Sequence, residues 1–284
     1  MTEQYWNWRF ENNPFGKPII KLAFYEDQLV GNYIANPVQL IHGKKSIPVL
    51  HSMTTMTDPD FSGLGISSNL ANQVYKMGKN LGFKAVIGYA NSKSHDMFIK
   101  KLGFFDLKTM NELIINNSQT TSKLIVEEIF DFNEVPKNFC FNIINSFEKF
   151  TIKRDNNIQN WRFKSNPENK YHCFKIVDDD EFYGYFVLKI YNGIKCHIVD
   201  FLLKDDIDCY NSMLNFSKLF CKKSNLDTLT LWTNYENFLD FLNLKSINIV
   251  PQETYFILKM LNEPINNLKD FKNWYVTMSD SDVF

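Results

Sequence analysis

The sequence predicts an α/β fold with a mixed sheet, made of two copies of one unit. An opening motif, Trp8-Arg9-Phe10 followed by Asn13-Pro14, recurs 153 residues later as Trp161-Arg162-Phe163 followed by Asn166-Pro167. After each copy come two apolar runs separated by an acidic turn, the pattern of a β-hairpin. In the first half, a strand, a helix and a strand follow the hairpin, which predicts a mixed sheet covered by helices.

The elements of the first half are predicted from periodicity and from turn residues. Apolar side chains recur every three or four residues over 66–81, which indicates a helix, and Gly82 is placed to end it. A second helix is expected to start at Ser92 or Ser94 and to end at Gly103. The expected strands are residues 19–25, 29–31, 46–57 and 84–89, with a loop over 58–65.

A polar stretch over 116–122 suggests the connection between the halves. It is followed by an expected strand, 123–130, and an expected helix, 135–150, with Pro136 in its first turn. The second half is expected to hold strands 171–177, 182–184 and 195–204 and a helix over 211–223. The predicted division is therefore a first domain, 1–115, a connection, 116–150, and a second domain, 151–284.

Composition excludes several classes of protein. The chain has 284 residues, 44% of them hydrophobic and 22% charged, with a net charge of −1. Without a basic excess we expect no nucleic acid partner and no anionic membrane partner. The five cysteines match no zinc spacing, so we expect reduced thiols and no metal site. No signal peptide and no membrane-spanning run is visible, so the expected location is cytoplasmic.

The segment most informative about chemistry is the loop over 57–67, which joins a strand to the long helix. Gly63 and Gly65 stand beside the start of that helix. The first N–H groups of a helix lack partners within it and carry the positive end of its dipole, so they suit a pyrophosphate. Glycine lets such a backbone approach the phosphates closely. The alternative is an ordinary tight turn.

This loop resembles the acetyl-CoA pyrophosphate loop of GNAT acyltransferases, Arg/Gln-x-x-Gly-x-Gly/Ala after an acidic residue and proline. Gly65 takes the place of the central glycine, whereas Ser62 and Ser67 stand where Arg or Gln and Gly or Ala are usual. Tyr89-Ala90-Asn91 and Lys101-Leu102-Gly103-Phe104 resemble the family's next strand and closing helix. The resemblance covers about residues 5–107 and reaches the second half only through the repeat.

The resemblance implies that strands 50–57 and 84–91 part to admit the pantetheine arm of acetyl-CoA or 3-hydroxybutyryl-CoA. A backbone N–H of the first strand would then stabilise the oxyanion of the tetrahedral intermediate. The cofactor-binding residues that it implies are Met56, Thr57, Ser62, Gly63, Leu64, Gly65, Ile66, Ser67, Asn91 and Phe98.

The family often uses a tyrosine to protonate the departing thiolate, and the corresponding position here is Ile99. His51 is our candidate base for the amine, with Ser52 and Thr54 as alternative hydrogen-bonding groups on the same strand. A structural role for His51, or proton removal by water, are the alternatives. Asp58 and Asp60 read as loop-capping carboxylates, and His95 reads as a surface residue.

The second half lacks the glycine loop. Asp205, Asp206 and Asp208 occupy the equivalent place and would repel a pyrophosphate. We therefore expect a degenerate GNAT-like domain that does not bind CoA and serves acceptor binding. Trp8, Arg9, Trp161 and Arg162 are candidates for the substrate-binding walls, or else anchor the first helix of each half.

The tandem arrangement and the ending Asp280-Ser281-Asp282 also resemble bacterial dTDP-amino-sugar N-acyltransferases. This implies a nucleotide-linked deoxyaminosugar acceptor in surface-polysaccharide synthesis and a monomer or homodimer. The alternatives are an aminoacyl-tRNA-dependent transferase, a protein or peptide N-acyltransferase, and a non-catalytic acyl-CoA sensor. The tail itself is either a disordered acidic end or, given its aromatic residues, docked on the body.

Overall fold

The computed structural model describes residues 1–116, 123–179, 181–243, 247–282 and 284. These form two compact units, and neither is one continuous stretch of chain. The first unit comprises Met1–Met110 and Gln252–Asn273, and the second comprises Asn111–Pro251 and Trp274–Phe284. The compact units therefore differ from the predicted division, because residues 252–273 belong with the first part of the chain.

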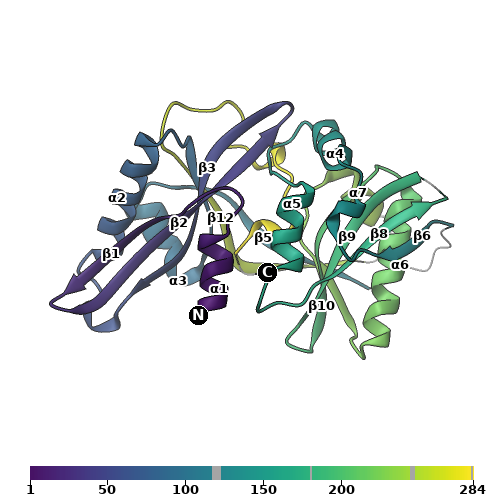
Figure 1. The fold of residues 1–284 in the computed structure, drawn as a ribbon, viewed down its shortest axis with the longest axis horizontal. Helices are drawn as coiled ribbons and strands as arrows, with labels where there is room; N and C mark the ends of the chain where they lie inside the picture. The colour runs from purple at the N-terminus through teal and green to yellow at the C-terminus, as the bar shows by residue number, and fades with distance from the viewer. Residues whose placement is uncertain (117–122, 180, 244–246, 283) are drawn as a thin grey trace. The chain divides into compact units, whose positions relative to one another are not determined.

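Figure 1 labels the elements of both units. The first unit contains α1 (Glu3–Trp6), a π-helical turn η1 (Asn7–Glu11), β1 (Ile19–Tyr25), β2 (Gln28–His42), β3 (Lys45–Thr57), a 3-10 turn (Pro59–Phe61), α2 (Ile66–Asn80), β4 (Ala85–Asn91), α3 (Ser92–Asp96), a π-helical turn η3 (Met97–Lys101) and a 3-10 turn (Phe271–Asn273). Two strands, β5 (Phe105–Ile115) and β12 (Ile247–Met260), contribute residues to both units.

The sheet of the first unit is mixed, as predicted. Its order is β1-β2-β3-β4-β12, with β3 and β4 parallel and the other neighbours antiparallel. The strand β12 was not predicted. It pairs with the whole of β4, from Thr254 opposite Asn91 to Met260 opposite Ala85. A segment from the end of the chain therefore completes the sheet that the first residues begin.

Each face of this sheet has its own covering helix. Leu50 of β3 packs with Leu70 and Val74 of α2 in the main core, and Figure 1 shows α2 lying along β1 and β2. On the other face, Met53 packs with Phe10 of η1. Because side chains alternate along a strand, Ser52 faces α2 with Leu50, whereas His51 faces the η1 side with Met53.

The strands of the second unit also pair in mixed directions, in the order β5-β11-β10-β9-β8-β6, with β10 and β11 parallel. Its elements are β6 (Ile125–Glu128), a 3-10 turn (Phe132–Glu134), α4 (Phe139–Phe147), β7 (Thr151–Ile152), α5 (Asn156–Gln159), a π-helical turn η5 (Asn160–Lys164), β8 (His172–Asp178), β9 (Glu181–Tyr191), β10 (Lys195–Leu203), α6 (Ile207–Lys223), β11 (Thr228–Leu231), α7 (Glu236–Asn243) and a 3-10 turn (Met278–Asp280).

The sequence repeat corresponds to a repeat of local structure. The two Trp-Arg-Phe motifs both lie in π-helical turns, η1 and η5. The hairpins β1–β2 and β8–β9 start at equivalent residues, and each carries a register shift at the same place, between Ala23 and Phe24 and between Ile176 and Val177. The predicted pair of hairpins is confirmed.

Several predicted boundaries were wrong, and capping explains most of them. The helix predicted over 135–150 spans only Phe139–Phe147, and Pro136 precedes it, with its carbonyl accepting the N–H of Phe139. Asn91, rather than Ser92 or Ser94, caps α3 with its side chain. The strand predicted over 123–130 covers Ile125–Glu128. Of the expected connection 116–122, residues 117–122 lie outside the described residues.

The chain end docks on the second unit rather than lying disordered. Trp274 to Met278 are all buried. The guanidinium of Arg154, itself buried, lies 2.9 Å from a carboxylate oxygen of Asp280 and 3.1 Å from one of Asp200. The tail is thus held by a buried ion pair. A charge left unpaired at this place would lower the free energy of unfolding by several kcal/mol.

Candidate functional site

The strands β3 and β4 part at the middle of the first sheet. Their parallel pairing covers Leu50 to Ser52 on β3 and ends at Ser52 opposite Gly88, although β3 runs on to Thr57 and β4 to Asn91. The splayed strands expected for the pantetheine arm are therefore present.

A bulge in β3 accompanies the parting. Met53 lies opposite Ile34 but Met56 lies opposite Asn32, so two residues of β3 face one residue of β2. The first of the two, Thr54, has a φ of 51°, a backbone conformation that residues other than glycine rarely adopt. The side-chain amide of Asn32 donates to its carbonyl at 2.7 Å. The bulge is thus held in place and turns the end of β3 away from β4.

The glycine loop follows directly and ends in an uncapped helix. Gly63 and Gly65 have φ values of 81° and 79°, and a Cβ on either would meet no atom within 4 Å. Gly65 is the N-cap of α2 and provides no side chain to its first turn. The N–H groups that open α2 are therefore left for a ligand, and open space lies in front of the glycines.

The base of this loop is fixed by hydrogen bonds. The N–H of Asp58 donates to the carbonyl of Val30 at 2.9 Å, and the side chain of Gln28 donates to the Asp58 carboxylate at 3.1 Å. The same carboxylate accepts the N–H of Asp60 at 3.0 Å. The predicted capping role of Asp58 is confirmed.

The equivalent helix start in the second unit is closed. Asp206 is the N-cap of α6, and its carboxylate accepts the N–H groups of Asp208 and Cys209. This cap explains why α6 starts at Ile207, earlier than predicted. The carboxylate already accepts these N–H groups, and its negative charge would repel a phosphate. This agrees with the prediction that only the first half keeps a CoA loop.

Comparisons with known proteins agree with this geometry. Residues 1–105 match a family described as an acetyltransferase (GNAT) domain. A GCN5-related N-acetyltransferase from Anabaena variabilis aligns with a TM-score of 0.70 and 15% identity, over 92% of this chain and 66% of that one. The chain has the GNAT fold.

Two further solved structures extend this likeness. A probable N-acyltransferase from Enterococcus faecalis aligns with a TM-score of 0.64 and 14% identity, over 85% of this chain and 62% of that one. N-myristoyltransferase from Saccharomyces cerevisiae, with bound myristoyl-CoA, aligns with a TM-score of 0.59 and 12% identity, over 97% of this chain and 75% of that one. The chain thus spans about two thirds or less of the first two structures. No curated protein matches it.

Within the GNAT fold, the predicted cofactor residues fall into three groups. Met56, Ser62 and Leu64 are exposed, with the two glycines, and Thr57, Ile66 and Ser67 are partly buried at the base of the loop. Asn91 is exposed and uses its carbonyl oxygen to cap α3. Phe98 is buried in the core against Phe104 and is remote from solvent, so the structure gives its ring a packing role.

The three predicted catalytic residues do not share one environment. His51 is buried on the η1 side, with its ring 5.9 Å from that of Tyr89. Ser52 is buried on the α2 side, and Thr54 is exposed in the bulge. His95, expected at the surface, stacks on Tyr255 and bonds to Asp106 at 2.8 Å.

The four residues predicted to bind substrate are buried or partly buried and make contacts within their own units. Trp8 and Arg9 are buried, with the guanidinium of Arg9 5.5 Å from the Trp8 ring centre. Trp161 is partly buried, and Arg162 donates to the carbonyls of Ser281 and Phe284. The alternative reading, that these residues anchor the first helical segment, fits these contacts.

Sequence reasoning missed Tyr33 and Tyr75, whose hydroxyls lie beside Ser52. It also missed Gly88, which faces Ser52 where the strands part. Nothing local marks these residues, because the contacts join β2, β3, β4 and α2. Gly88 meets Ser52 through the sheet register and Tyr33 reaches Ser52 from the neighbouring strand β2, whereas Tyr75 reaches Tyr33 through the packing of α2 on the sheet.

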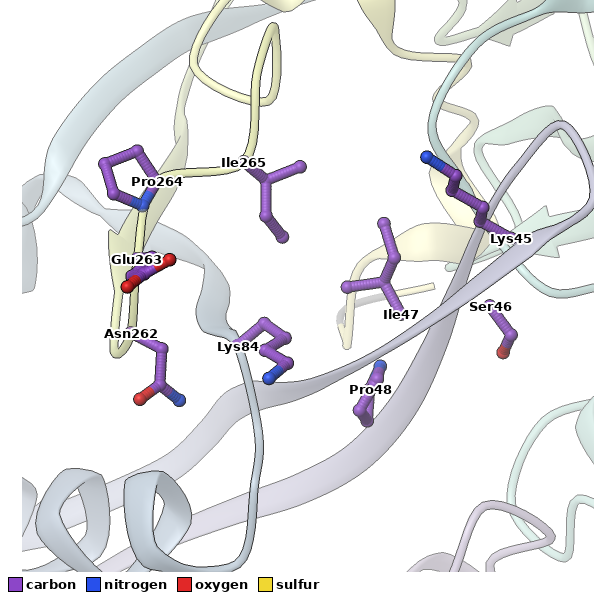
Figure 2. A pocket seen from close by; sticks show the side chains of 9 residues that line it. All are labelled: Lys45, Ser46, Ile47, Pro48, Lys84, Asn262, Glu263, Pro264 and Ile265. Atoms are coloured by element: carbon purple, nitrogen blue, oxygen red, sulfur yellow. The ribbon is translucent and has the colours of Figure 1, made fainter.

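A pocket of about 530 Å³ lies elsewhere in the first unit. It is lined by the start of β3, by Lys84 just before β4, and by residues 262–265, and Figure 2 shows Ile47 and Ile265 pointing into it. Since β3 and β4 are parallel, this pocket is at the opposite end of both strands from the point where they part. It is therefore separate from the glycine loop.

Over the described ranges, no group of three or more His, Cys, Asp or Glu side chains is placed to hold a metal ion. In the same part of the chain, no helix is long and apolar enough to cross a membrane. All five cysteines are free thiols and buried.

Proposed function

We propose that this protein transfers an acyl group from acyl-CoA to an amine. The observation that carries the proposal is the uncapped start of α2 at Gly65, reached by a strand that has just parted from its neighbour. The match of residues 1–105 to a GNAT acetyltransferase domain supports it.

The residues of the first unit suit each part of this reaction. The glycine loop and the first turn of α2 would receive the pyrophosphate. The end of β3, where it has left β4, offers backbone groups that would pair with the pantetheine arm and donate to the oxyanion. The amine attacks the thioester carbon, the C–S bond breaks, and the electron pair leaves with sulfur as the thiolate of CoA.

The proton of the amine leaves by one of two routes. In the first route the base is His51, the titratable candidate that the sequence suggested, which is on the η1 side of β3, opposite to α2. In the second route water takes the proton. The variant His51→Gln distinguishes them, because loss of a protein base removes the rise of kcat with pH that deprotonation of that base produces, whereas proton removal by water leaves the pH profile of kcat unchanged.

The acceptor we propose is a nucleotide-linked deoxyaminosugar, with acetyl-CoA or 3-hydroxybutyryl-CoA as donor, in the cytoplasm. The support for this acceptor is the sequence resemblance of the two Trp-Arg-Phe motifs and the Asp280-Ser281-Asp282 ending. The second unit, whose repeat of the π-turn and hairpin lacks an open helix start, would then serve acceptor binding.

The test is release of free thiol from acetyl-CoA and 3-hydroxybutyryl-CoA against a panel of nucleotide-linked amino sugars, with peptides and tRNA alongside. Release with one dTDP-amino sugar supports the full proposal. Release only with a peptide would reassign the acceptor. Tight CoA binding without thiol release from any amine would replace the transferase with an acyl-CoA sensor.

A further inference from the structure

A chain of three buried hydroxyl groups ends beside the point where β3 and β4 part. The hydroxyl of Tyr75, on α2, lies 2.5 Å from that of Tyr33, on β2, which lies 2.5 Å from the hydroxyl of Ser52, on β3. All three side chains are buried, with at most 6% of any one exposed. Such short contacts in a core align the groups closely.

One of the three hydroxyl hydrogens in this hydrogen-bonded chain is not used by its two contacts. Three hydroxyls carry three hydrogens, and the two contacts use two of them. If the chain runs from Tyr75 through Tyr33 to Ser52, the hydrogen of Ser52 remains available to a further acceptor. Burial raises the pKa of Tyr33 to about 12 and that of Tyr75 well above its ordinary value, so both tyrosines keep their protons near neutral pH.

Ser52 occupies the point of divergence itself. It is the last residue of β3 to pair with β4, and its partner there is Gly88. A Cβ on Gly88 would lie 3.6 Å from the Cβ of Ser52, so the glycine leaves space beside the serine that any other residue would fill. Gly88 is not in the left-handed region, so its backbone does not explain the glycine.

The position where the resemblance implies a proton donor for the leaving group carries no hydroxyl in this sequence. Ile99, at the position where related enzymes often carry a tyrosine, is apolar and packs against the core under α2. The hydroxyl chain lies on the same face of the sheet, because Tyr33 and Tyr75 belong to that core too.

We propose that the hydroxyl of Ser52, oriented by Tyr33 and Tyr75, donates a hydrogen bond to the sulfur of CoA as the thiolate departs. The inference rests on the proposed function. No bond to Ser52 forms or breaks: the sulfur takes the electron pair of the C–S bond, the serine hydrogen bonds to it, and solvent protonates the thiolate after release. Ser52 is then a catalytic residue, and the two tyrosines are positioning residues.

A hydrogen bond to an ionised acceptor is about twice as strong as one between neutral groups, so the effect is larger on the thiolate than on the thioester. We expect the pKa of the thiol of bound CoA to lie below that of free CoA. Ser52→Ala should raise the pKa of the bound thiol by about one unit and lower kcat by about tenfold, with little change in KM.

The experiment titrates the thiol of CoA bound to the full chain by the ultraviolet absorbance of the thiolate, in parallel with kcat and KM. The variants are Ser52→Ala, Ser52→Thr, which keeps a hydroxyl, and Tyr33→Phe, which breaks the chain in the middle. Ser46→Ala is the matched control, since this exposed serine on the same strand bonds only to Gln39 in the described contacts.

The expected result is a raised thiol pKa in Ser52→Ala, a smaller rise in Tyr33→Phe, and wild-type values in Ser52→Thr and Ser46→Ala. An unchanged thiol pKa in a folded Ser52→Ala that still binds CoA would overturn the inference and leave the proposed transferase intact. If Ser52→Ala does not fold, Tyr33→Phe, which removes only an oxygen, decides by the same readout. Failure of the wild-type chain to bind CoA would instead overturn the proposed function.

Discussion

Thr57 and Ser67 lie on either side of the glycine loop, and their side-chain oxygens are 2.5 Å apart. Thr57 is the last residue of β3, and Ser67 is in the first turn of α2. The contact closes the loop at its base, so the loop glycines are held in one geometry before any ligand arrives. Pre-ordering of this kind reduces the entropy lost on binding.

Breaking this contact should cost stability at the loop base. We expect Thr57→Val and Ser67→Ala each to lower the free energy of unfolding by about 1 kcal/mol, because each leaves the other hydroxyl without its partner. The double variant should lose less than the sum, since only one contact exists to be lost. Denaturant unfolding of the four proteins measures this coupling, and strictly additive losses would mean that the contact contributes nothing.

Placing a carboxylate at the start of α2 should abolish CoA binding selectively. Gly65→Asp places a carboxylate at the N-cap of α2, as Asp206 does at that of α6, so its negative charge repels the pyrophosphate. We expect CoA affinity to fall at least about tenfold. Gly43→Asp is the control, since Gly43 also has a positive φ (56°) and open space around it. Calorimetric titration showing equal weakening in both variants would contradict a phosphate site at Gly65.

Stability should fall below neutral pH because of His197. Burial, assisted by Lys195, lowers its pKa to about 4 from an ordinary 6.5, while Glu112 opposes the shift. Its Nδ1 lies 2.7 Å from the hydroxyl oxygen of Thr230, whose hydrogen goes to Glu112, so Nδ1 donates and the ring is neutral. The folded chain therefore resists protonation between pH 6.5 and 4, where the unfolded chain accepts it.

The stability that the neutral His197 allows is fully present above pH 6.5. As the pH falls towards 4, the free energy of unfolding decreases progressively, by roughly 3 kcal/mol in total. His197→Asn should be less stable at neutral pH but should show a shallower loss over this window. Urea unfolding at several pH values measures both slopes. Parallel slopes for the two proteins would show that other groups cause the acid sensitivity.

The buried guanidinium of Arg154 should be among the most sensitive positions in the second unit. Arg154→Met leaves Asp200 and Asp280 buried without their cation, and we expect a loss of about 3–5 kcal/mol. Lys153→Met, at the preceding residue, which is partly exposed and paired with Asp155, should change stability by less than about 0.5 kcal/mol. Thermal unfolding compares the two, and similar effects would show that the ion pair does not stabilise the tail.

The sequence predicted those features that local patterns determine. The two hairpins and the glycine loop could be predicted because alternation, turn residues and each copy of the repeated motif lie within short segments. The helix over 135–150 was overextended because no glycine or proline marks its true end, where Glu148 adopts a left-handed conformation. The hydroxyl chain at Ser52 and the pairing of β12 with β4 were not readable, because they join residues far apart in the chain.

The site residues show the same limit. His51 and Ser52 are neighbours in sequence, so their pattern could not distinguish them, yet the sheet sends one towards η1 and the other into the core under α2. The side that each faces depends on which helix covers which face, and that is decided by the whole first unit.

The pairing of β12 with β4 has a consequence for biosynthesis. A ribosome delivers the chain from residue 1 onward, so the CoA loop and α2 leave the exit tunnel well before Gln252–Met260 is made. Until then the edge of β4 that β12 covers presents unpaired backbone N–H and C=O groups, to which another chain can bind. Truncations that keep only residues 1–110 should accordingly be prone to aggregation, and a nascent chain of this protein depends on finishing its synthesis before its first sheet can close.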